Sequence, residues 1–142
     1  MSFIGVTVPP ERVHTIHCGA DANYHPLPSA DIEAFKATYQ LPDTFVLYLG
    51  TLEPRKNVDG LIRAYALWRE REPDAPPLVV AGGKGWYTQR IFELVESLNL
   101  TNSVRFPGYI PQDELTLWYN AATLFVYPSH FEGFGLPVLE AM

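Results

Sequence analysis

The sequence predicts an α/β protein built on a parallel sheet with helices on both faces. Two observations predict this class. Short continuous apolar runs alternate with segments whose apolar residues recur at helical spacing. Each run is followed by glycine or proline, which is typical of short strands buried on both sides. The alternation of strand and helix over residues 43–142 therefore predicts a single Rossmann-like layer.

Four strands and four helices are expected in alternation. The strands are predicted at residues 44–49, 77–81, 103–106 and 123–127. The apolar faces of the first three helices are Leu61, Tyr65 and Trp68; Ile91, Leu94, Val95 and Leu98; and Leu115, Trp118 and Tyr119. We expect Trp68, Trp118 and Tyr119 to lie in the core. A last helix should begin near Pro137, because proline suits a first helical position.

The first 42 residues differ from the rest of the chain. A short strand is predicted at residues 13–18, and a helix that carries Ile32, Phe35 and Tyr39 is expected after Ser29. We expect residues 1–42 to form a linker strand and entry helix, and residues 43–142 to form the sheet domain. The fourth strand would be an unprotected edge. We therefore expect the chain to be a piece of a longer protein or a truncated gene product.

Composition excludes several classes of function. Ten basic and sixteen acidic residues give a net charge of −6, which argues against a nucleic-acid partner bound by a basic surface. The single Cys18 precludes an internal disulfide. His14 and His17 lack a companion cluster of metal ligands, so no metal is expected. The sequence shows no signal peptide and no apolar run of transmembrane length, so we expect a cytoplasmic protein.

Ligands of open parallel sheets bind at the carboxyl ends of the strands. The loops after the first and fourth predicted strands should therefore face each other. Arg55 and Lys56 stand at a predicted helix start, where cations are unfavourable unless a phosphate binds there; two solvated side chains are the alternative. Glu132 and Glu140 could contact two parts of one ligand. Separately, they would be a polar turn residue and an acid that favours a helix dipole.

The segment from Glu132 to Glu140, EGFGLPVLE, resembles the E-x7-E signature of family 4 retaining glycosyltransferases with the GT-B fold. Other stretches resemble that family in the same order, namely residues 17–21, 49–57, 79–86 and 104–110. The resemblance implies the C-terminal, donor-binding half of a GT-B fold, in incomplete form.

The resemblance also implies roles for single residues. Arg55 and Lys56 would hold the diphosphate of a nucleotide-sugar donor, Glu132 would contact sugar hydroxyls and Glu140 the ribose. Arg55, Lys56 and Glu132 are then the implied catalytic residues. The remaining implied donor-binding residues are Gly50, Thr51, Tyr109, Ile110, Phe134, Gly135 and Leu136.

The implied reaction needs no metal or other cofactor. Fixed cations would stabilise the departing nucleoside diphosphate, and a carboxylate would favour the oxocarbenium-like sugar. The donor would be GDP-, dTDP- or UDP-linked. The glycan or lipid acceptor would bind through an N-terminal domain missing from this chain, with the full-length protein at the inner face of the membrane. We therefore expect little or no transfer by these 142 residues alone.

Two other functions stay open. The chain could be a non-catalytic nucleotide-binding module, or a module that self-associates into a homo-oligomer through the exposed edge of the fourth strand. It could also be a glycoside hydrolase that uses Glu132 and Glu140. Arg55 and Lys56 argue against the hydrolase, because hydrolysis of a glycoside requires no diphosphate clamp.

Overall fold

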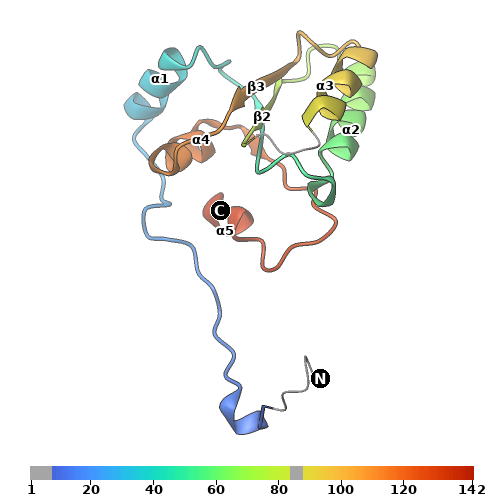
Figure 1. Ribbon diagram of the computed structural model, residues 1–142. Coiled ribbons are helices and arrows are strands. Elements are labelled where there is room, and N and C mark those ends of the chain that lie inside the picture. The colour runs from blue at the N-terminus through green and yellow to red at the C-terminus, as the bar shows by residue number, and fades with distance from the viewer. Residues whose placement is uncertain (1–7, 84–87) are drawn as a thin grey trace.

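The computed structural model describes residues 8–83 and 88–142. Within these residues, the strands form one parallel sheet in the order β3-β2-β1-β4 (Figure 1). The strands are β1 (Val46–Leu49), β2 (Leu78–Ala81), β3 (Val104–Gly108) and β4 (Leu124–Phe125). The predicted α/β class with a parallel sheet is confirmed.

The two central strands are the best-paired part of the sheet. β1 and β2 pair in register from Val46 with Leu78 to Leu49 with Ala81. Their side chains are almost entirely buried, as continuous apolar sequence predicts for strands covered on both faces. Gly82 follows β2 with a φ of +142°, and a Cβ atom there would lie 2.0 Å from the backbone oxygen of Gly50. Only glycine fits this close approach of the two strand ends.

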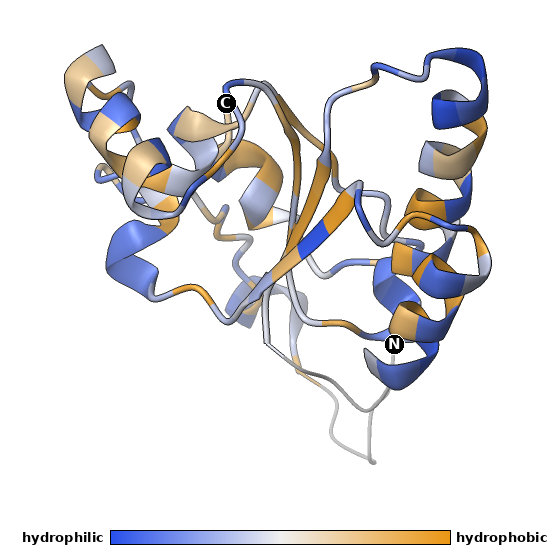
Figure 2. Ribbon diagram, turned by 90° about the horizontal axis from the view of Figure 1, so that it is seen from above, coloured by the Kyte–Doolittle hydropathy of each residue, from blue (hydrophilic) through white to orange (hydrophobic). Residues whose placement is uncertain are grey.

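The helices cover both faces of the sheet. α2 (Val58–Arg71) and α3 (Thr88–Ser97) pack on one face, and α1 (Ser29–Thr38) and α4 (Leu115–Ala121) on the other (Figure 1). The strands are mostly hydrophobic, apart from one hydrophilic segment, and the helices have hydrophobic and hydrophilic sides (Figure 2). A short last helix, α5 (Leu136–Glu140), follows the loop after β4.

Two of the three aromatic residues that were predicted to lie in the core are buried. Trp118 and Tyr119 are buried in the core, as expected, and Trp118 packs edge-on against Phe35 of α1 with ring centroids 5.4 Å apart. The prediction was wrong for Trp68, which is 38% exposed. Its ring makes an edge-on contact with buried Tyr65, with ring centroids 6.2 Å apart, but the residue stays at the surface.

Two predicted strands differ from the structure. The predicted strand at residues 13–18 is wrong: this segment is exposed and pairs with no strand within the described residues. A strand needs a neighbour for its backbone groups, and the segment runs away from the sheet (Figure 1). β4 has two residues instead of five, although backbone bonds from Thr123 to Phe45 and from Val126 to Leu47 continue its contact with β1.

Candidate functional site

The loops that follow β1 and β4 lie against each other, as the topology predicted. After β1 the chain forms the 3₁₀ turn η2 (Pro54–Lys56), and Asn57 adopts a left-handed conformation with a φ of +55°. The Asn57 Nδ2 donates to the carbonyl oxygen of Pro128 at 3.1 Å. The backbone N–H of His130 donates to the carbonyl oxygen of Arg55 at 2.9 Å. These bonds join segments about 70 residues apart and fix the position of both loops.

Three of the predicted site residues form one ion cluster. The Glu132 carboxylate accepts from Arg55 Nη1 at 2.8 Å on one oxygen and from Lys56 Nζ at 2.6 Å on the other. Arg55 Nε also donates to Glu53 at 3.1 Å. The cations at this helix start are therefore compensated by an anion of the chain itself. Neither of the two alternatives from the sequence, solvated side chains or a bound phosphate, included this contact.

Lys56 is an unusual lysine because it is only 7% exposed. Besides the Glu132 carboxylate, its Nζ donates to the Tyr127 hydroxyl at 2.5 Å and lies 4.7 Å from the centroid of the Tyr127 ring. Tyr127 is not among the predicted site residues, because it ends the fourth predicted strand and its sequence context indicates only a place in the sheet. A buried ammonium requires such partners, since an unpaired buried charge is costly.

The electrostatics of the cluster keep Glu132 ionised. Partial burial raises the pKa of this carboxyl, but the hydrogen bonds that it accepts, first that from Lys56, outweigh burial and lower the pKa to about 2. Glu132 is thus an acceptor with a full negative charge at neutral pH. It can bind hydroxyl donors or favour a positive charge, and it has no proton to deliver.

Other predicted donor-binding residues line a pocket at the carboxyl ends of β1, β2 and β3. The pocket has a volume of about 280 Å³. Gly50, Thr51, Tyr109 and Ile110 all contribute to its wall. Ile110 is buried, while the Tyr109 side chain is largely exposed. The structure therefore brings these four residues together, as expected for one ligand-binding surface.

Glu140 lies apart from the ion cluster. Its carboxylate accepts from the Tyr119 hydroxyl at 2.9 Å and lines a different pocket, of about 240 Å³, together with Tyr24. Burial, followed by the hydrogen bond to Glu140, raises the pKa of Tyr119. Glu140 is the last residue of α5, not a first-turn residue as expected. The helix-dipole explanation for this acid is therefore wrong.

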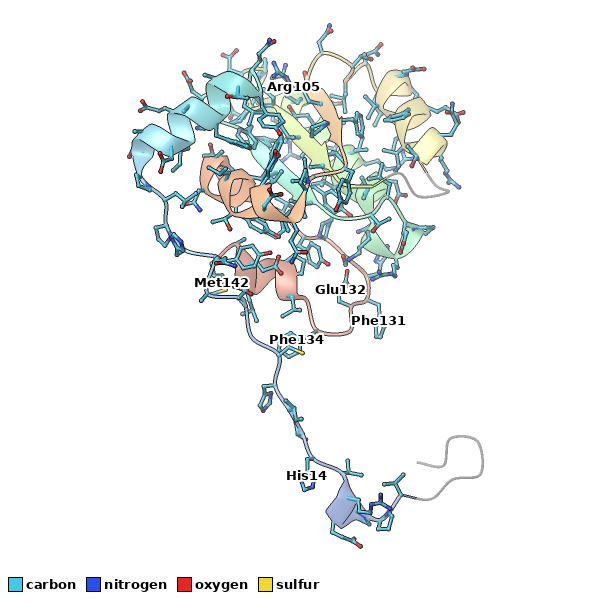
Figure 3. The ribbon with its side chains drawn as sticks, turned by 60° about the vertical axis from the view of Figure 1, so that its left-hand side comes forward. His14, Arg105, Phe131, Glu132, Phe134 and Met142 are labelled. Atoms are coloured by element: carbon cyan, nitrogen blue, oxygen red, sulfur yellow. The ribbon has the colours of Figure 1, made fainter. Side chains whose placement is uncertain are left out.

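The loop around Glu132 exposes two phenylalanines. Phe131 and Phe134 are both largely exposed and point away from the sheet, whereas Glu132 points towards it (Figure 3). Gly135 has a φ of +90° and immediately precedes Leu136, the first residue of α5. A side chain at this backbone conformation would be strained, so glycine sets the direction in which α5 begins.

The part of the chain that the structure describes contains neither a metal-ligand cluster nor a helix that could span a membrane. Among residues 8–83 and 88–142, no group of three or more His, Cys, Asp or Glu side chains is arranged to hold a metal ion. In the same part of the chain, no helix has the length and apolarity needed to cross a membrane. Trp86, part of one stretch that carried the resemblance, lies outside the described residues.

The four-stranded parallel sheet and the helices on its two faces match the fold of the C-terminal domain of GT-B glycosyltransferases. Residues 30–142 match the family model described as "Glycosyl transferases group 1". The chain belongs to this family.

Relatives and solved structures agree with this assignment. O-antigen chain mannosyltransferase B of Escherichia coli is 40% identical over 135 residues, which are 94% of this chain and 35% of that protein. The C-terminal domain of a glycosyl transferase group 1 family protein from Francisella tularensis is 25% identical, with a TM-score of 0.69 over 83% of this chain and 62% of that one. Anabaena Alr3699/HepE in complex with UDP-glucose is 25% identical, with a TM-score of 0.73 over 87% of this chain and 34% of that one. The chain thus spans about a third of the mannosyltransferase.

Proposed function

We propose that the chain is the donor-binding part of a retaining glycosyltransferase, which moves a hexose from a nucleotide-sugar to a glycan or lipid acceptor. The observation that carries the proposal is the cluster of Arg55, Lys56 and Glu132 at the carboxyl end of the sheet. Two fixed cations beside one ionised carboxylate suit a ligand that combines an anionic leaving group with a polar sugar.

The two cations serve the departing diphosphate. When the bond between the sugar C1 and the phosphate oxygen breaks, negative charge grows on the leaving group, and nearby cations lower the energy of that transition state. The Lys56 ammonium is held by the Tyr127 hydroxyl as well as by Glu132, so it stays at the site while the charge develops. Arg55 is half-exposed and offers its other guanidinium N–H groups to solvent or ligand.

Glu132 serves the sugar. Its carboxylate accepts hydrogen bonds from sugar hydroxyls and favours the positive charge that develops on the ring. We assign the base of the nucleotide to the pocket formed by Gly50, Thr51, Tyr109 and Ile110. The remaining donor contacts are assigned to the backbone of Phe134, Gly135 and Leu136 and to Glu140, whose Oε1 would accept from the ribose.

The relatives support the ligand class of the proposal. One is named a mannosyltransferase, and one solved structure holds UDP-glucose. For this chain we propose a GDP-, dTDP- or UDP-linked hexose, with a mannosyl donor as the first to test. Residues 43–142 would form the donor domain and residues 1–42 its linker. A further N-terminal domain of the whole, cytoplasmic protein would bind the acceptor at the membrane.

Calorimetric titration tests the proposal. The purified chain is titrated with GDP, UDP, dTDP and ADP, beside Lys56→Ala and the matched control Lys36→Ala. We expect saturable binding of one diphosphate that Lys56→Ala weakens by at least tenfold, because a charge-assisted contact is lost. Lys36 donates to the backbone of Asp43, outside the site, so its variant should bind normally. A folded chain that binds none of the four, or equal loss in both variants, contradicts the proposal.

A second candidate function is self-association through β4. Leu124 in this strand is 51% exposed, and β4 pairs only with β1 within the described residues. An unpaired strand edge can pair with a second copy. Sedimentation over a wide concentration range tests this candidate, which a constant monomer mass would contradict.

A further inference from the structure

Glu132 binds the same two cations that a donor diphosphate would require. Arg55 Nη1 and Lys56 Nζ each donate to a separate oxygen of its carboxylate, at 2.8 and 2.6 Å. The Glu132 side chain is 19% exposed and that of Lys56 is 9% exposed, so solvent weakens their attraction only in part. The cluster is therefore an anion site whose occupant belongs to the chain.

The cations keep only part of their donor capacity for another anion. A lysine ammonium has three N–H groups, and Lys56 directs two of them to Glu132 and Tyr127. Arg55 uses Nε for Glu53 and Nη1 for Glu132. A diphosphate must either displace the Glu132 carboxylate or share the cations with it. In both cases a negatively charged ligand approaches an ionised glutamate that has lost some of its compensation.

A sugar changes this balance. If Glu132 releases one or both cations, its oxygens need new donors, since an uncompensated carboxylate in a partly buried site is costly. The hydroxyls of a sugar attached to the diphosphate are such donors. A nucleoside diphosphate without the sugar offers none at this position. The same carboxylate thus opposes one ligand and accepts the other.

We propose, building on the proposed function, that Glu132 is a specificity-determining residue by which the site distinguishes a complete nucleotide-sugar from a bare nucleoside diphosphate. The carboxylate competes with the diphosphate for Arg55 and Lys56, and sugar hydroxyls compensate it only when the whole donor is bound. After transfer, the product diphosphate faces the uncompensated carboxylate. Glu132 therefore promotes product release as well as donor recognition.

The test compares two ligands on two variants. Affinities for GDP and GDP-mannose, and for UDP and UDP-glucose, are measured calorimetrically on the wild-type chain, on Glu132→Gln and on Glu53→Gln. We expect Glu132→Gln to bind the bare diphosphate on the order of tenfold more tightly, because it frees two cations, and to lose the preference for the nucleotide-sugar. The same substitution thus raises the affinity for the bare diphosphate and lowers the affinity for the nucleotide-sugar relative to it.

Glu53→Gln is the matched control. It also removes one negative charge beside Arg55. The Glu53 carboxylate accepts from Arg55 Nε, whereas the bond of Glu53 to Lys56 is between backbone groups and stays in the variant. We expect it to raise the affinity for both ligands by a similar, smaller factor. An equal effect of Glu132→Gln on both ligands, or no gain for the bare diphosphate, overturns this inference and leaves the proposed function standing. A wild-type chain that binds neither ligand overturns both.

Discussion

The glutamates at the two ends of the segment 132–140 are chemically identical, yet they have different partners. Glu132 accepts from two cations that come from another part of the chain. Glu140 accepts from a neutral phenol, that of Tyr119. The first glutamate is one element of a charged cluster, whereas the second is held by a single neutral hydrogen bond.

The difference shows what a carboxylate can do at each place. A carboxylate between two cations stabilises the fold through charge, and its bonds can be exchanged for those of a charged ligand. A carboxylate on a phenol keeps its whole charge uncompensated and has an oxygen left for a neutral hydroxyl. The two glutamates should therefore respond differently to loss of their partners.

Lys56→Met should produce the largest effect on stability. The substitution keeps most of the apolar stem but removes the ammonium, so Glu132 retains only the exposed Arg55 as a cation partner. We expect a loss of about 3 kcal/mol in the free energy of unfolding, measured with urea. Lys36→Met is the control, because Lys36 donates to the Asp43 backbone and lies 6.0 Å from the centre of the Phe45 ring. Equal losses in the two variants would show that the ion cluster makes no contribution to stability beyond that of an ordinary lysine.

Acid should weaken the fold through Glu132. Its pKa is about 2 in the folded chain, below the ordinary value of 4.5, so its contribution is complete above pH 4.5 and is lost as the pH falls towards 2. We expect this contribution to be about 2 kcal/mol, after allowing for solvent around the partly exposed side chain. The free energy of unfolding, measured between pH 6 and 2, should fall less steeply with pH for Glu132→Gln than for the wild-type chain. Glu140→Gln is the control, because it keeps the contribution of Glu132. An unchanged slope in Glu132→Gln would contradict the assignment.

Much of the fold could be predicted from local sequence. The runs that became β1 and β2 are continuously apolar, and strands covered on both faces need no other signal. The predicted strand at residues 13–18 failed because a strand also needs a partner, which local sequence does not reveal. The prediction that Trp68 is buried was wrong for a similar reason. Helical spacing indicates which face of the helix a residue shares, but not how far the layer that covers this face extends.

The site was predictable where topology determines it. Arg55, Lys56 and Glu132 follow strands that are neighbours in the sheet, so their meeting could be anticipated from strand order. Their direct bonding to each other could not. Tyr127 was missed because it lies 71 positions from Lys56 and its apolar surroundings suggest only a core residue. The bond between Tyr119 and Glu140 depends in the same way on how α4 and α5 meet.

Tyr127→Phe sharpens the comparison on the side of Glu132. It keeps the ring beside the Lys56 ammonium but removes the hydroxyl that accepts a hydrogen bond from this ammonium. We expect a loss of about 1.5 kcal/mol, because a hydrogen bond to a charged donor disappears from a partly buried site. Tyr127→Leu, which also removes the aromatic face, should lose about 1 kcal/mol more in the same urea titration. Identical stabilities of the two variants would show that the ring makes no contribution.

Tyr119→Phe tests the side of Glu140 and should give the smallest effect, about 1 kcal/mol of unfolding free energy. The ring stays in the core, while Glu140 loses its donor and turns to water, which it can reach because it is only partly buried. Tyr39→Phe is the control: its hydroxyl donates to Glu114 at an exposed position, and its loss should change stability by a few tenths of a kcal/mol at most. If Tyr119→Phe proved as costly as Lys56→Met, Glu140 would be held as firmly as Glu132. The contrast between a charged and a neutral partner would then not explain the different behaviour of the two glutamates.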